Sequence, residues 1–87
     1  MLYIITFDVR SFNKVLIDKI HAYRVWAMLS PKSFLIVSDE SPEVICNNLK
    51  ICMSEGERIF VGTLTSPAAW VGMPQEVTDW IHEYFKR

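Results

Sequence analysis

The carboxylate with the most suggestive position in this sequence is Asp8, which follows the apolar segment Met-Leu-Tyr-Ile-Ile-Thr-Phe. Residues 2–7 are rich in isoleucine and aromatic residues, which favours a β-strand. In a two-fold symmetric dimer, Asp8 could meet its own copy and hold a divalent cation between two carboxylates. The structural interpretation is that Asp8 caps the following helix or pairs with Arg10. The sequence places no second acid and no histidine at ligand spacing from Asp8, and both interpretations stay open.

Other catalytic arrangements find little support. His21 and His82 lie on separate predicted helices, and neither has the serine, cysteine or acid neighbours of a catalytic triad. The three glycines form no phosphate-binding loop, which disfavours NTPase, kinase and dinucleotide chemistry. Cys46 and Cys52 are six residues apart on a predicted helix, so they point in different directions and are expected to be reduced, buried structural residues.

Aromatic residues on the predicted strands raise the question of an RNA-stacking platform. The basic and glycine context of such platforms is present only as the fragment Arg58–Gly62, and we therefore expect these aromatic residues in the core or in a dimer interface. They are Tyr3, Phe7, Phe34 and Phe60. Trp70 lies in a loop rich in proline and glycine, and we expect it to fasten that loop to the fold. An exposed Trp70 would instead be a recognition residue.

Composition narrows the class of protein. The chain has 87 residues, 51% of them hydrophobic, and a net charge of −1. This length allows one domain, and so high an apolar share predicts a self-association interface. The charge balance counts against an obligate nucleic-acid binder, although a local basic patch is compatible with it. The sequence shows neither a signal peptide nor an apolar run near twenty residues, so we expect a cytoplasmic protein with no membrane contact.

The hydrophobic pattern predicts an alternation of strands and amphipathic helices. Strands are expected at residues 2–7, 25–29, 33–37 and 58–64. A first helix is expected after an N-cap at Ser11. A second begins at Ser41-Pro42-Glu43, which combines an N-cap, a proline at the first helical position and an acid in the first turn. Apolar residues from Val77 to Phe85 recur at helical spacing and predict a final helix.

The order β-α-β-β-α-β predicts an α+β, ferredoxin-like sandwich with a four-stranded antiparallel sheet and an added C-terminal helix. We expect residues 1–87 to form a single domain, with its core in about 1–65 and the C-terminal loop and helix in about 66–87. The strands are apolar on both sides, so the sheet face away from the first two helices needs a cover. That cover is either a second subunit in a homodimer or the terminal helix.

These features resemble a known group of small proteins. The matching segments are Phe7-Asp8, Trp26, Ser33-Phe34-Leu35-Ile36 and Ala68-Ala69-Trp70-Val71-Gly72. The strand end Phe7-Asp8-Val9, the order β-α-β-β-α-β and the size are similar to the small CRISPR-associated spacer-integration family, which includes endonuclease-like members and relatives among toxin–antitoxin proteins. The similarity is greatest to uncharacterised bacterial and phage proteins labelled SinR-family, although Phe34 stands where those proteins usually have Trp. The resemblance implies dimers, and in some relatives a metal-dependent nuclease that uses the aspartate at the position of Asp8.

Two functional hypotheses follow. The first is a non-catalytic homodimeric interaction module of a defence, toxin–antitoxin or phage–host conflict system, which binds a protein partner around Trp70 and needs no cofactor. The second is a metal-dependent nuclease in which Asp8 is both catalytic and the ligand of Mg²⁺ or Mn²⁺, while Arg10 or Lys32 positions the phosphate backbone. The lack of a second acid near Asp8 in the sequence and the slightly negative net charge favour the non-catalytic module.

Overall fold

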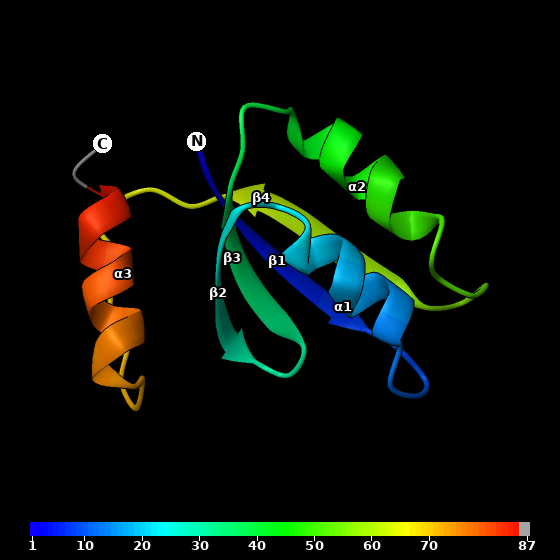
Figure 1. Ribbon diagram of the computed structural model, residues 1–87, viewed down its shortest axis with the longest axis horizontal. Helices are drawn as coiled ribbons and strands as arrows, with labels where there is room; N and C mark the ends of the chain where they lie inside the picture. The colour runs from blue at the N-terminus through cyan, green and yellow to red at the C-terminus, as the bar shows by residue number, and fades with distance from the viewer. Residues whose placement is uncertain (86–87) are drawn as a thin grey trace.

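The computed structural model describes residues 1–85 and shows an α+β fold with one four-stranded sheet and three helices (Figure 1). In chain order the elements are β1 (Leu2–Asp8), α1 (Lys14–His21), β2 (Val25–Ser30), β3 (Ser33–Val37), α2 (Pro42–Lys50), β4 (Arg58–Thr63) and α3 (Gln75–Phe85). The strands lie in the order β2-β3-β1-β4, and every neighbouring pair is antiparallel. The predicted strands and helices are therefore confirmed, as is the antiparallel sheet.

One face of the sheet, called here the first face, is covered by α1 and α2. Alternate residues of β1 and β3 point into this layer because side chains along a strand alternate between the two faces. The buried cluster consists of Tyr3, Ile5, Phe7, Leu16, Ile20, Phe34, Ile36, Ile45 and Leu49. Leu16, Ile20, Ile45 and Leu49 come from the two helices, at the four-residue spacing of an amphipathic helix.

The helix starts follow local side-chain chemistry. The Ser41 hydroxyl accepts a hydrogen bond from the Val44 N–H at 3.2 Å, which confirms the predicted start of α2. The prediction of Ser11 as the cap of α1 is wrong, because Asn13 occupies that position. The Asn13 Oδ1 accepts from the Leu16 N–H at 3.0 Å, and its Nδ2 donates to the Cys52 carbonyl at 2.7 Å. The asparagine amide therefore caps α1 and also ties it to the turn that follows α2.

The opposite face, called here the second face, is partly covered by α3, which lies across the sheet from α1 and α2 (Figure 1). Ile81 of α3 packs with Leu2 and Leu35 in a second buried cluster. The terminal helix thus covers part of its own sheet, one of the two predicted arrangements. Further along β1, the second-face residues Thr6 and Asp8 are exposed and polar. No helix within residues 1–85 is long and apolar enough to cross a membrane.

Candidate functional site

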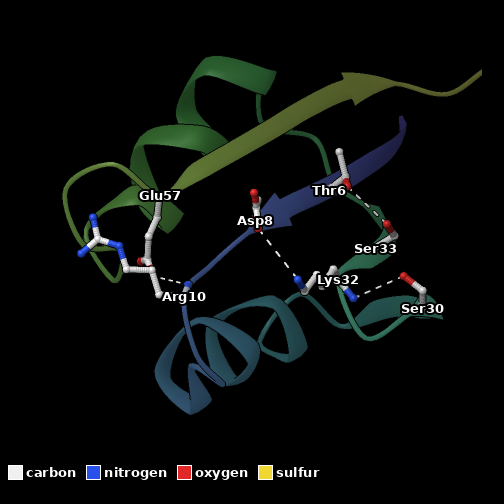
Figure 2. Close-up of polar contacts among 7 residues, drawn as sticks. All are labelled: Thr6, Asp8, Arg10, Ser30, Lys32, Ser33 and Glu57. Carbon is white, nitrogen blue, oxygen red and sulfur yellow. Dashed lines mark hydrogen bonds and ion pairs between the residues drawn. The ribbon is translucent and has the colours of Figure 1, made fainter.

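Asp8 ends β1 on the uncovered part of the second face. Strand pairing places it directly opposite Arg58, the first residue of β4. Lys32 reaches Asp8 from the turn between β2 and β3, with 3.8 Å between its Nζ and the Asp8 Oδ1 (Figure 2). Both side chains are well exposed, at 60% for Lys32 and 73% for Asp8. One carboxylate is therefore accompanied by two cationic residues in a solvated setting.

Both structural roles expected for Asp8 are wrong, since it neither caps α1 nor pairs with Arg10. The guanidinium Nη2 of Arg10 donates to the Glu55 carbonyl at 2.9 Å, and its backbone N–H donates to the Glu57 Oε2 at 2.9 Å. Figure 2 shows the Arg10 side chain directed away from Asp8. Arg10 therefore connects the loop after β1 to the loop before β4, and of the two predicted backbone-positioning residues only Lys32 lies beside Asp8.

Glu57 is the acceptor that holds these two loops together. Its Oε1 accepts from the Ser54 N–H at 2.7 Å and its Oε2 accepts from the Arg10 N–H. These two backbone donors, that of Arg10 foremost, lower the pKa of Glu57 below its ordinary value of 4.5, because each stabilises the ionised carboxylate. Glu57 is thus committed to a structural role.

The residues that one chain places around Asp8 are poor ligands for a metal ion. No group of three or more histidine, cysteine or acidic residues that could hold a metal ion occurs in the described chain, residues 1–85. The charged residues beside Asp8 are Lys32 and Arg58, both cationic. Oxygen ligands are what Mg²⁺ and Mn²⁺ require, and here a second carboxylate would have to come from another copy of the chain.

The sequence analysis weighed Phe60 and the fragment Arg58–Gly62 for an RNA-stacking platform, but it did not place Arg58 and Phe60 beside Asp8. Alternation along β4 places them together on the second face, whereas Ile59 and Val61 pack into the core of the first face. With Thr6 and Asp8 they line a shallow depression of about 310 Å³. The signal was present in the sequence as the alternation of Arg58, Phe60 and Gly62 with apolar residues.

The interpretation of the strand aromatics as core residues is confirmed for Tyr3, Phe7 and Phe34, which are buried. It is wrong for Phe60, whose exposed fraction is 63%. The physical reason is register: Phe60 lies opposite Thr6, a residue of the second face that α3 does not cover. An interface with a second subunit stays a prediction for Phe60.

Trp70 fastens its loop to α3, as expected. The indole Nε1 donates to the Thr78 Oγ1 at 3.0 Å, and the ring contacts His82 and Phe85 with centroids 5.3 and 6.3 Å apart. The side chain is partly buried in the cluster that includes Ile81. Recognition of a partner through Trp70 stays a prediction.

No family model matches this sequence, and neither a curated protein nor a solved structure matches it. Function is therefore inferred from the geometry of the site, and membership in the CRISPR-associated family stays a prediction.

Proposed function

We propose that this chain is a ferredoxin-like, non-catalytic interaction module that acts as a homodimer in the cytoplasm. The observation that carries the non-catalytic assignment is the setting of Asp8, a solitary carboxylate paired with Lys32 and opposite Arg58. A metal ion there would compete with two cations for one carboxylate, which disfavours metal-assisted hydrolysis. The succession β-α-β-β-α-β with sheet order β2-β3-β1-β4 supports the ferredoxin-like assignment.

The free edge of β2 supports the dimer. This strand, Val25–Ser30, contains no charged residue and no proline, the two devices that commonly protect edge strands from pairing with another chain. Trp26 and Met28 are exposed on it. If two copies pair antiparallel with Ala27 opposite Ala27, Trp26 of each copy lies opposite Met28 of the other, so the contact is self-complementary. The setting of such a module, as the resemblance implies, is a defence, toxin–antitoxin or phage–host conflict system.

Light scattering coupled to size-exclusion chromatography tests the dimer. We expect the wild type to elute with the mass of two chains at tens of micromolar protein, and Met28→Lys to elute as a monomer. Val44→Lys is the matched control, because Val44 on α2 has a similar exposed fraction, 47% against 50% for Met28. A monomeric wild type, or equal effects of the two variants, would contradict the proposed dimer.

A metal-dependent nuclease is the second candidate. One observation favours it: Lys32 and Arg58 stand beside Asp8, where they could contact a phosphodiester. In this case the Asp8 residues of two copies would meet in a dimer other than the one through β2, because pairing of the β2 edges keeps the two β1 strands apart. The two carboxylates would hold Mg²⁺ or Mn²⁺, which would polarise the phosphate and activate water. Cleavage of a labelled oligonucleotide in Mn²⁺ that is lost in Asp8→Asn would establish this candidate over the first.

A further inference from the structure

We infer that the uncovered part of the second sheet face binds single-stranded nucleic acid, with a base stacked on Phe60 and phosphates on Arg58 and Lys32. This part of the sheet, called here the open strip, consists of Thr6, Asp8, Lys32, Ser33, Arg58 and Phe60. The inference goes beyond the dimeric module and requires no cleavage.

The geometry of Phe60 supports base stacking. A single exposed apolar residue is ordinary on a protein surface, but Phe60 is 63% exposed on a sheet face and stands among polar residues. Its ring leans along β4 over Gly62: a Cβ at position 62 would lie 2.8 Å from the Phe60 Cε1. The glycine therefore makes room for the ring in this position. An aromatic ring held in place on an open sheet face is the element on which unpaired bases stack.

The charges of the open strip are placed to contact phosphates. Arg58 lies two residues before Phe60 on the same face, which corresponds to roughly 6.7 Å along the strand. Among residues 1–85, Arg58 forms no ion pair. Lys32 is paired with Asp8 at 3.8 Å, and both side chains are exposed. Because exposed ion pairs contribute little free energy, the Lys32 ammonium can leave the carboxylate and bind a phosphate.

Hydroxyl groups complete the surface. The Ser33 Oγ donates to the Thr6 Oγ1 at 3.3 Å, and Thr6 lies directly opposite Phe60 in the strand register. These groups are available to the sugar and to base edges beside the stacked base. Asp8 repels phosphate, and only two cations contribute. We therefore expect a Kd on the order of 100 µM at moderate salt, with log K falling by about 1.4 per tenfold rise in salt for two contacts to a single strand.

Fluorescence anisotropy with fluorescein-labelled oligo(dT) and oligo(rU) of twelve nucleotides tests the inference, at low salt and in EDTA so that no metal-dependent cleavage occurs. We expect Phe60→Leu to weaken binding about fivefold or more, because the aromatic ring on which one base stacks is lost. Phe12→Leu is the matched control, because Phe12 is also exposed but lies in the loop after β1. It should bind as the wild type does.

A second variant tests the electrostatic contribution to oligonucleotide binding and leaves the Phe60 ring in place. Arg58→Gln should weaken binding and lower the salt slope by about 0.7, the contribution of one phosphate contact. Circular dichroism and light scattering on each variant show whether the fold and the dimer are intact, so a failure of the dimer is seen separately from a failure of binding.

Five results would overturn the inference, four of them from the binding and light-scattering measurements. They are no binding at millimolar protein, equal affinity for a duplex of the same sequence, equal losses in Phe60→Leu and Phe12→Leu, and dissociation of the dimer by Phe60→Leu. Competition by UMP as effective as that by the oligonucleotide would also overturn it and would assign the open strip to a free nucleotide.

Discussion

Asp8 and Lys32 form an ion pair across the second face of the sheet, with 3.8 Å between Oδ1 and Nζ, although one ends β1 and the other lies in the turn between β2 and β3. The strand-end aspartate thus has a lysine as its partner. Its neighbour across the sheet, Arg58, is also cationic. The aspartate therefore belongs to a surface of mixed charge.

Removing the charge of Asp8 should barely affect stability. We expect Asp8→Asn to change the free energy of unfolding by less than about 1 kcal/mol, because both members of the pair are exposed and screened by solvent. Urea denaturation of Asp8→Asn, Lys32→Gln and the double variant measures the pair's coupling energy. A loss above about 2 kcal/mol in Asp8→Asn would show that the aspartate has a structural role beyond its ion pair with Lys32.

The attachment of α3 to the sheet should depend on Ile81. This side chain is 3% exposed and packs between Leu2 and Leu35, so Ile81→Ala should lower the free energy of unfolding by about 2–4 kcal/mol through lost contacts and a cavity. Val71→Ala removes an exposed apolar group and should cost less than about 0.5 kcal/mol. Equal stabilities of the two variants would mean that α3 does not pack on the sheet in solution.

The hydrogen bond from Trp70 to Thr78 should make a smaller contribution. Thr78→Val leaves the indole N–H of Trp70 without its acceptor and should cost about 1 kcal/mol. Thr65→Val is the control for the loss of a hydroxyl, because Thr65 is exposed in the loop between β4 and α3, which also contains Trp70. Chemical denaturation followed by tryptophan fluorescence compares the two, and an unchanged midpoint in Thr78→Val would argue against this contact.

Acid stability should depend on Glu57. Its pKa is lower in the folded protein than in the unfolded chain, so its contribution to stability is fully present above the ordinary value of 4.5. The contribution is lost as the pH falls below that value through the lower folded-state pKa, because the carboxylate that accepts from Arg10 and Ser54 becomes protonated.

Urea midpoints measured between pH 7 and pH 3 show this dependence. Glu57→Gln should be less stable than the wild type at pH 7, and the difference should shrink as the pH falls through this window. Glu55→Gln, whose backbone carbonyl rather than its side chain accepts from Arg10, should follow the wild-type profile. A constant difference between Glu57→Gln and the wild type at all pH values would contradict the assignment.

Local signals predicted most of the fold. The start of α2 followed from Ser41 and Pro42, and the strand boundaries followed from apolar runs between turns. The start of α1 was misplaced because Asn13 gains a bond to the Cys52 carbonyl, a tertiary contact that no local pattern reveals. From the sequence, either a second subunit or the terminal helix could cover the second face. The packing of Ile81 with Leu35 shows that α3 covers part of it.

The site was less predictable than the fold. The position of Asp8 at a strand end could be read from the sequence, whereas its partner Lys32 depends on how the turn between β2 and β3 lies against β1. Phe60 and the fragment Arg58–Gly62 stood out in the sequence, but only the register of β4 against β1 shows that Arg58 and Phe60 share the second face with Asp8. Register is set by long-range pairing, so single-sequence patterns specify it poorly.

Calorimetric titration of the metal-free protein with Mn²⁺, with wild type and Asp8→Asn side by side, tests the non-catalytic assignment most directly. We predict no binding heat at millimolar Mn²⁺ in either protein, because Lys32 and Arg58 accompany a solitary carboxylate. Binding near one ion per dimer in the wild type, lost in Asp8→Asn, would contradict this assignment and make the metal-dependent nuclease the leading function.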